Sequence, residues 1–245
     1  MKTEKYQRRL YRDWVKAKDL RHTRIIARET DLRILADKLL DKEFVIEKIR
    51  LYRWDIENYI MKDRRFLISL VPISIEASAP RIVQAMNEAA LKANAGPMAA
   101  VAGALVQFLG NDLLKLGLKE VILQNGGDIF LKTRKIRKVS IYSGNSKRLK
   151  NLALEIRPKD TPLGICTSSG TVGHSLSLGC ADSVVILARS AALADASATA
   201  VGNLVQSKKD LERALQFAQR IPGVSGAVII SKDSLVSWGK VEFVR

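Results

Sequence analysis

The stretch that most constrains the fold is residues 164–203, which read GICTSSGTVGHSLSLGCADSVVILARSAALADASATAVGN. Its first part, residues 164–180, contains four glycines and six serines or threonines, and we interpret it as a polar, flexible loop rather than a core element. Residues 183–188 form an apolar run short enough for one buried strand. The alanine-rich segment that follows predicts a helix over residues 191–205, with Ser190 as its N-cap.

The predicted helix carries one acid and one hydroxyl four residues apart, Asp195 and Thr199. Residues at this spacing lie on the same face of a helix. A carboxylate beside a hydroxyl, with little bulk around them, suits a hard cation such as Mg²⁺. A loop rich in glycine and hydroxyl groups suits phosphate. We therefore hypothesise that this stretch forms a site for a nucleotide phosphate and a metal ion.

Histidine and cysteine limit the remaining chemistry. The chain has only two histidines, His22 and His174, which excludes a site built from several histidines. We expect His22 at the surface of a basic strand, whereas His174 lies in the glycine-rich loop and is a candidate catalytic acid or base. The alternative for His174 is a purely local hydrogen-bonding role. The two cysteines, Cys166 and Cys180, are too few for a disulfide scaffold and wrongly spaced for a paired zinc knuckle, so we expect reduced thiols. We interpret Cys166 as a semi-buried, inert thiol, and the alternative is a nucleophile with a base nearby.

The net charge of +16 is carried mainly by two segments. Residues 1–65 hold 19 basic and 12 acidic side chains, and residues 132–160 hold 10 and 2. We interpret these charges as solvated surface, because they are scattered among acids rather than clustered with aromatic residues. The alternative is an attractive field for an anionic partner. Nucleic acid is the disfavoured form of that partner, since no recognised nucleic-acid-binding module is present.

No signal-peptide pattern opens the chain, because residues 1–12 are charged. The longest stretch free of charged residues, 161–181, is too rich in Gly, Ser and Thr to cross a membrane. We therefore expect a cytoplasmic protein without a membrane partner.

The order of predicted elements favours one continuous α+β domain over residues 1–245. Residues 1–65 are expected to form a basic lead-in of a strand hairpin and a long amphipathic helix (41–61), and residues 66–245 the core with the site motifs. The other predicted helices span residues 80–94, 97–116 and 209–220. The other predicted strands span residues 121–124, 128–133, 139–142, 152–156, 226–231, 234–238 and 241–244. We expect residues 67–75 to form a loop or a short edge segment, since Pro72 interrupts them.

Two further motifs admit both a structural and a functional interpretation. The helix over residues 97–116 opens almost entirely with small residues, which permits close approach by another helix or by a ligand phosphate at the amides of its first turn. Asn125-Gly126-Gly127 lies between two apolar runs, which is a strong hairpin signal. The alternative is that the bare glycines let a ligand reach the backbone.

Four ordered motifs carry a resemblance: PMAAVAGAL (97–105), NGGDIFL (125–131), GICTSSGTVGHSLSLG (164–179) and ALADASATAVGN (192–203). Together they resemble an uncharacterised protein family related to the ApbE-like FAD:protein FMN transferases. The likeness extends to YRDWVKAKDL (11–20) and covers nearly the whole chain. It implies an ApbE-like, T-fold-like α+β domain in which mixed, mostly antiparallel sheets pack with helices.

The resemblance also implies a ligand set. In the transferases, the positions matching Asp195 and Thr199 bind Mg²⁺, and the Asn-Gly-Gly-Asp turn lies against FAD. The nucleotide-binding positions implied here are Asn125, Gly126, Gly127, Asp128, Thr167, Ser168, Ser169 and Gly170. The implied reaction is transfer of an FMN group to a protein threonine with AMP leaving, for which Asp195 and His174 are the candidate catalytic residues.

The chain departs from the transferases at one informative place. They carry a lysine at the glycine-rich helix start, whereas residues 98–107 contain no charged residue. The Gly-His-Ser segment at residues 173–175 also resembles the uncharacterised relatives rather than the transferases. This favours an alternative: an accessory or binding protein of the same fold without transferase activity, in anaerobic sulfur assimilation as suspected for relatives. The partners that we expect are a nucleotide or another anionic ligand, a protein acceptor or partner, and a second copy in a homodimer.

Overall fold

A computed structural model describes residues 15, 17–28, 30–144, 146–170 and 178–244, and its main feature is an eight-stranded antiparallel sheet. In spatial order its strands are β1 (Arg21–Ala27), β2 (Thr30–Ala36), β3 (Val121–Asn125), β4 (Asp128–Lys132), β7 (Leu163–Ser168), β8 (Ser183–Ala188), β9 (Val224–Ser231) and β10 (Ser234–Gly239). A second, three-stranded sheet consists of β11 (Phe243–Val244), β6 (Ala153–Ile156) and β5 (Arg137–Ser140). Every strand pair in the described part of the chain is antiparallel, and the expected α+β class is confirmed.

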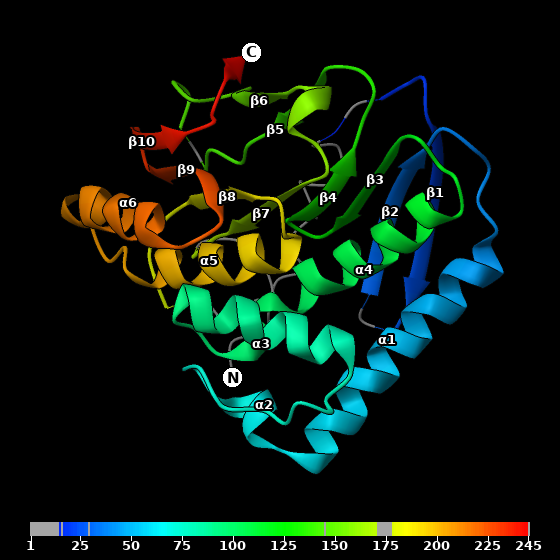
Figure 1. Ribbon diagram of the computed structural model, residues 1–245. Helices are drawn as coiled ribbons and strands as arrows, with labels where there is room; N and C mark the ends of the chain where they lie inside the picture. The colour runs from blue at the N-terminus through cyan, green and yellow to red at the C-terminus, as the bar shows by residue number, and fades with distance from the viewer. Residues whose placement is uncertain (1–14, 16, 29, 145, 171–177, 245) are drawn as a thin grey trace, which may run out of the picture.

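The helices cover one face of the large sheet, and the small sheet covers the other (Figure 1). The helices are α1 (Lys42–Lys62), α2 (Arg65–Ile68), α3 (Arg81–Ala93), α4 (Val101–Lys115), α5 (Ala191–Asn203) and α6 (Leu211–Arg220). Three short 3₁₀ turns accompany them: η2 (Pro97–Ala100), η3 (Pro158–Asp160) and η4 (Lys208–Asp210). The α4 and α5 helices lie directly on the sheet, with α3 outside them and α1 along the edge that carries β1 and β2 (Figure 1).

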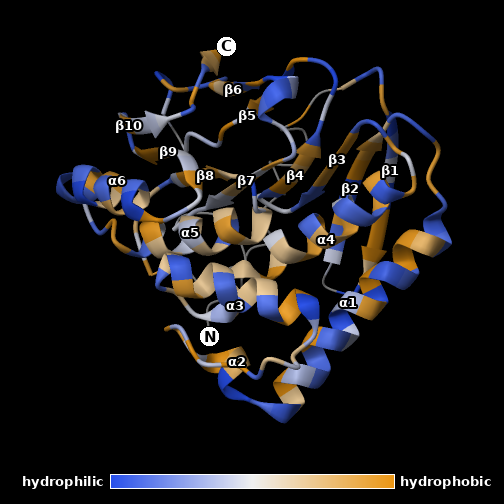
Figure 2. Ribbon diagram, viewed as in Figure 1, coloured by the Kyte–Doolittle hydropathy of each residue, from blue (hydrophilic) through white to orange (hydrophobic). Residues whose placement is uncertain are grey.

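The large sheet is apolar on both faces because alternate strand residues enter different cores. Leu123 and Phe130 belong to the core beneath the helices, whereas their neighbours Ile122 and Ile129 belong to the core beneath the small sheet. Figure 2 shows these strands as hydrophobic ribbons between the two covering layers. Both coverings are therefore needed to keep the sheet out of water.

Local sequence accounts for most of the elements. The α1 helix begins after Asp41, whose carboxylate accepts hydrogen bonds from the amides of Glu43 (2.9 Å) and Phe44 (3.3 Å), as an N-cap does. The Asn-Gly-Gly segment forms the hairpin turn between β3 and β4, with Gly126 at φ +64°. The structural interpretation of that motif is thus confirmed.

The basic N-terminal hairpin is an integral part of the large sheet. The β2 strand pairs with β3, with Ile34 opposite Leu123. The pairing joins segments almost ninety residues apart, which periodicity alone does not predict. The residues expected to form a lead-in therefore extend the same sheet that carries the site motifs.

Two expectations were wrong. Residues 164–168, expected in a polar loop, lie in the buried strand β7, because Gly164 and Cys166 are small and their neighbours Leu163 and Ile165 are apolar. Residues 65–68 form one helical turn, α2, before the expected irregular segment begins, because Asp63 accepts a hydrogen bond from the Arg65 amide (3.0 Å) and starts the turn.

One helical run in the described chain, Pro97–Lys115, is long and apolar enough to cross a membrane by length and composition alone. Half of it is buried within the protein. Its place on the sheet beside α5 accounts for its apolar character as that of a core helix.

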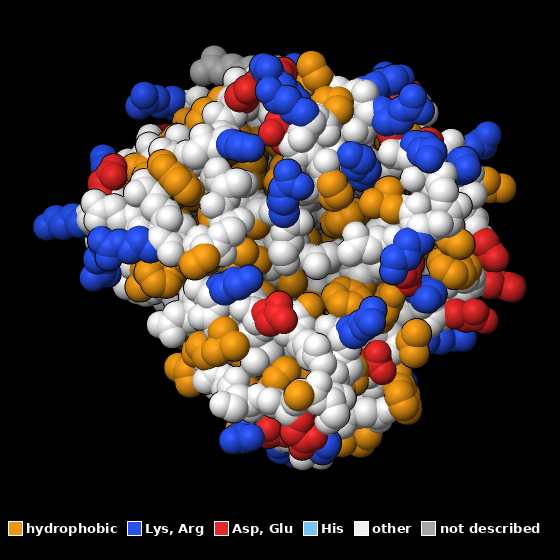
Figure 3. Space-filling view, in the orientation of Figure 1, with side chains coloured by type: hydrophobic (Ala, Val, Ile, Leu, Met, Phe, Trp, Pro, Cys, Tyr) orange, Lys and Arg blue, Asp and Glu red, His pale blue; other side chains and the backbone are white. Residues whose placement is uncertain are grey.

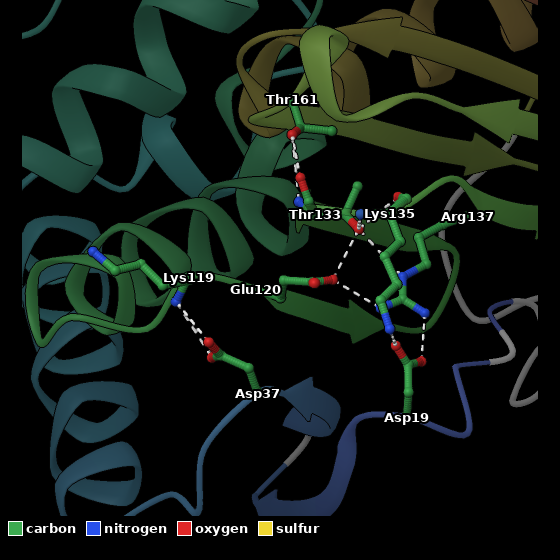
Figure 4. Close-up of polar contacts among 8 residues, drawn as sticks. All are labelled: Asp19, Asp37, Lys119, Glu120, Thr133, Lys135, Arg137 and Thr161. Carbon is green, nitrogen blue, oxygen red and sulfur yellow. Dashed lines mark hydrogen bonds and ion pairs between the residues drawn. The ribbon is translucent and has the colours of Figure 1, made fainter.

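A buried ion-pair network fastens the small sheet to the large one (Figure 4). Arg137 on β5 contacts Glu120, just before β3, at 2.7 Å and Asp19, before β1, at 2.6 Å. The side chains of Arg137 and Glu120 are almost fully buried. The Thr133 hydroxyl donates to Glu120 (3.0 Å) and accepts from Arg137 (3.2 Å), which completes the network.

Replacing Arg137 by methionine should lower the free energy of unfolding by about 3 kcal/mol, because Glu120 is then left buried without its cation. The matched control is Arg134→Met, which removes an exposed arginine three residues away and should change stability by less than about 0.5 kcal/mol. Urea unfolding of both variants measures the difference. Equal effects would show that the Arg137 ion pairs contribute nothing specific.

The same network should make the protein less stable in acid. Burial alone would raise the pKa of Glu120, but the Arg137 guanidinium, with further hydrogen bonds, outweighs burial and lowers that pKa. Hydrogen bonds from Arg137 and Lys135 also lower the pKa of Asp19. Both carboxyl groups therefore have lower pKa values in the folded protein than in the unfolded chain. The stabilisation that they provide is fully present above about pH 4.3 and is lost as the pH falls further. Urea unfolding across this range should show a smaller loss for Arg137→Met than for the parent protein.

Candidate functional site

The site is built where α5 begins against β7. A Cβ atom added to Gly164 on β7 would lie 2.4 Å from the Ala191 Cα atom, so only glycine lets the helix start approach the strand this closely. The Cys166 thiol donates to the carbonyl oxygen of Ala191 at 3.3 Å. Small residues on β7 therefore set the position of α5.

The first turn of α5 is held by two side chains. Ser190 is the N-cap, as predicted, and its hydroxyl accepts a hydrogen bond from the Leu193 amide (3.2 Å). Gln107 of α4 accepts hydrogen bonds from the Ser190 hydroxyl (3.0 Å) and the Ala192 amide (3.2 Å). Sequence reasoning missed Gln107, although a single amide side chain within the apolar run 97–110 was a usable signal.

Asp195 lies in the second turn of α5 and points at the start of α4. Its Oδ2 atom accepts a hydrogen bond from the Gly103 amide at 2.8 Å. The α4 helix has Ala100 at its own N-cap position and no side-chain cap there, so an acid from another helix satisfies one of its first-turn amides. The predicted metal ligand thus also caps α4.

The small residues at the start of α4 are explained by packing. A Cβ atom on Gly103 would lie 2.3 Å from the Ala191 carbonyl oxygen and 2.7 Å from the Asp195 Cβ atom. The two helices therefore approach through glycine, and this contact brings Asp195 within reach of the Gly103 amide.

Asp128 brings a second half-buried carboxyl group to the same place. It begins β4 directly opposite Cys166 on β7, and its carboxyl group interacts with the Cys166 thiol. Burial raises the pKa of Asp128 to about 7. Burial, and next the charge of Asp128, raise the pKa of Asp195 well above its ordinary value, and the α4 amides offset this only in part. When two such acids lie near one another, either one of them keeps its proton or a cation binds beside them and balances their charge.

The same surroundings disfavour the ionised form of the Cys166 thiol. Burial and the neighbouring Asp128 and Asp195 charges raise the pKa of Cys166 well above its usual value. The thiolate that nucleophilic chemistry requires is therefore disfavoured. Cys180, by contrast, is exposed.

The two predicted nucleotide-binding motifs lie side by side. The Thr167 amide donates to the Gly127 carbonyl oxygen at 3.1 Å, which joins the Asn125–Asp128 turn to the end of β7. A Cβ atom on Gly127 would lie 2.8 Å from the Thr167 carbonyl oxygen, whereas one on Gly126 would meet nothing within 4 Å. Gly126 therefore has open space beside it, and Gly127 is required by packing.

The glycine-rich loop is described only at its two ends. Gly170 donates its amide to the Ala181 carbonyl oxygen (2.9 Å), and the Leu178 amide donates to the Asn203 side chain at the end of α5 (2.9 Å). Ser168 and Ser169 are half-buried between Thr167 and Gly170. His174 lies outside the described residues, so its role as an acid or base remains a prediction.

The described residues offer oxygen ligands to a metal ion but no complete cage. Asp195 and Thr199 lie about one turn apart on α5, and both residues are half-buried. Among the described residues, no group of three or more His, Cys, Asp or Glu side chains is placed to hold a metal. This donor set fits Mg²⁺, which proteins commonly hold with one or two carboxylates while water and substrate phosphates supply the remaining ligands.

Comparison with known proteins gives consistent likenesses. Residues 12–237 match a family model described as "AbpE bacteria". A UPF0280 protein of Methanosarcina acetivorans is 40% identical over 87% of this chain and 85% of its own length. A UPF0280 protein of Methanocaldococcus jannaschii is 38% identical over 89% of this chain and 90% of its own.

Solved structures match the fold at low sequence identity. The flavinyl transferase ApbE of Pseudomonas stutzeri, in its apo form, superimposes with a TM-score of 0.56 at 12% identity, covering 92% of this chain and 95% of that one. The flavin transferase ApbE of Vibrio cholerae gives a TM-score of 0.57 at 12% identity, covering 92% and 97%. At this identity the likeness establishes the α+β fold alone.

The contact between α4 and α5 yields a matched pair of substitutions. Gly103→Ala should lower the free energy of unfolding by about 1–3 kcal/mol, because its Cβ atom would collide with the backbone of α5. Gly202→Ala, also in a helix, places its Cβ atom 3.4 Å from the nearest atom and should be neutral or stabilising by about 0.5 kcal/mol. Urea unfolding compares the two variants, and equal stabilities would contradict the close contact.

Proposed function

The chain belongs to the UPF0280 family and has the ApbE-like fold, and from this premise we propose that it binds FAD together with Mg²⁺ between α5, β7 and the β3–β4 turn. The single observation that carries the proposal is a pair of half-buried carboxyl groups, Asp195, which accepts a hydrogen bond from the Gly103 amide of α4, and Asp128, whose charge raises the pKa of Asp195. The proteins of known structure that share the fold are flavin transferases, which suggests the nucleotide.

The acid pair supports a cation site for a physical reason. Two carboxyl groups taken out of water cannot both ionise cheaply unless a positive charge lies beside them. Asp195 accepts a hydrogen bond from the Gly103 amide at 2.8 Å, which offsets only part of the cost of its negative charge. In the proposal Mg²⁺ supplies the missing charge through Asp195 and Thr199, and Asp128 either retains its proton or contacts the ion through water.

The neighbouring turn supports a phosphate position. Gly126 has open space where a side chain would stand, and the hydroxyl-bearing end of β7 lies against the same turn. Backbone amides and hydroxyl groups gathered at one turn can bind phosphate oxygens. In this proposal Asn125–Asp128 and Thr167–Gly170 hold the dinucleotide, and Asp195 and Thr199 bring Mg²⁺ to its pyrophosphate.

The bound ion would neutralise the pyrophosphate and stabilise AMP as a leaving group, the chemistry needed to transfer FMN to a protein threonine. The residues of this chain would orient the dinucleotide and exclude water from the buried acids. A second candidate function, binding without transfer, is favoured by one observation: the helix start over residues 98–107 contains no charged side chain. An accessory protein with a protein partner would use the same site in this way.

Asp195→Asn tests the metal site. The amide oxygen of asparagine can still accept the Gly103 hydrogen bond, so the fold and the α4 cap should be preserved while the charge is removed. We expect the parent to bind FAD with a Kd near 1 µM (about −8 kcal/mol) in Mg²⁺ and far more weakly in EDTA. The variant should bind weakly in both. Calorimetry and flavin fluorescence measure the two affinities.

The control is Glu212→Gln, which removes an exposed acid on α6 and should bind FAD as the parent does. Equal Mg²⁺-dependent affinity in Asp195→Asn and the parent would refute the site. Release of AMP from FAD by the parent would favour transfer over simple binding. Stable FAD in a Mg²⁺-dependent complex would favour the accessory function.

A further inference from the structure

The α1 helix carries an apolar stripe on the face that points away from the protein. Its buried face consists of Val45, Ile49, Tyr52, Ile56 and Tyr59. On the opposite face Leu51, Trp54 and Met61 are 47%, 63% and 77% exposed. Their spacing of three and seven residues places them in one line along the helix. Exposed tryptophan, leucine and methionine in one line are typical of a protein interface rather than of solvated surface.

The apolar surface continues in the sequence beyond the end of α1. Ile68 of α2 and the following Leu70 and Val71 are each more than 60% exposed. Figure 3 shows hydrophobic side chains along the lower right side of the molecule, over α1, interspersed with charged ones.

The two ends of the stripe carry opposite charge. Residues 41–47 include three acids and one lysine, a net of −2, and residues 62–65 include three bases and one acid, a net of +2. Figure 3 shows acidic side chains gathered at the edge of the molecule where α1 begins. Acids at the start of a helix and bases at its end also interact favourably with the helix dipole, so these charges alone do not indicate a partner. They do so together with the exposed apolar residues that lie between them.

We propose that the outer face of α1 is the surface on which a second copy of this chain docks, with the two α1 helices antiparallel about a two-fold axis near Leu51 and Trp54. In this arrangement the acidic start of each helix, with Glu43 and Glu47, lies beside the basic end of the other, with Lys62 and Arg64. A parallel arrangement would place like charges together. A two-fold axis brings the same patch of both copies into contact, as an isologous interface requires.

The opposed charges argue for a second copy over a lipid surface. Within the end segment Lys62 pairs with Glu76 (2.5 Å) and Arg65 with Asp63 (2.8 Å), so this face has acidic as well as basic groups. A surface that binds anionic lipid needs a mainly basic rim around its apolar residues. The acidic start of α1 would be repelled by such a surface, whereas it complements the end of a second α1.

The test is sedimentation of the full chain in magnesium-free buffer at concentrations from about 1 to 100 µM. The parent should approach twice its mass of 27.2 kDa as the concentration rises. Trp54→Glu should raise the dimer dissociation constant by at least about 30-fold, since it places a charge at the centre of the interface. Circular dichroism should remain unchanged because Trp54 is exposed. Leu91→Glu, at a leucine on α3 that is 55% exposed, is the matched control and should associate as the parent does.

Charge reversal tests the antiparallel arrangement. Glu43→Lys with Glu47→Lys should weaken association, and adding Lys62→Glu with Arg64→Glu should restore it, with circular dichroism confirming that α1 remains folded. A parent that stays monomeric at every concentration, whether or not it binds vesicles of anionic lipid, overturns the proposal. So does a Trp54→Glu variant that associates like the parent, and failure of the fourfold reversal to restore association overturns the antiparallel arrangement.

Discussion

The structure depends on a sheet that must be covered on both faces. Its strands place apolar side chains alternately above and below, so neither face can be left in water. The helices cover one face, and the small sheet of β5, β6 and β11 covers the other. The ion pairs of Arg137 join β5 of the small sheet to Glu120 and Asp19, which precede strands of the large sheet, and so fix the position of one sheet on the other.

The candidate site follows from the first covering. The α5 helix can lie close to β7 and α4 because glycine stands at both contacts, Gly164 and Gly103. That close packing removes water from Asp195 and places it near Asp128, at the end of a hairpin that the sheet itself positions. The site's unusual acids are therefore a product of the same packing that stabilises the domain.

Local patterns predicted the fold better than they predicted its contacts. Helical periodicity located α1, and the serine before residue 191 located the start of α5. The β7 strand was missed because Gly164, Thr167 and Ser168 resemble a loop in composition, and only the neighbouring strands and α5 make an extended, buried conformation favourable. The Asp195 and Thr199 motif was recognisable, but the contacts of Asp195 with Gly103 and Asp128 join residues that are far apart in sequence. The same is true of the contact between Gln107 and the first turn of α5. No single-sequence pattern contains such pairings.

The small sheet gathers both ends of the described chain. Val15 bridges to Val139 on β5, and Phe243 and Val244 pair with β6. The strands of the large sheet, by contrast, lie side by side in the order in which they occur along the chain, so each new strand pairs with one that precedes it. During synthesis the large sheet can thus assemble strand by strand, while its second face is completed only once residue 244 has left the ribosome. Until then the nascent chain presents an incompletely covered apolar surface, the condition in which chaperones and aggregation compete for a protein.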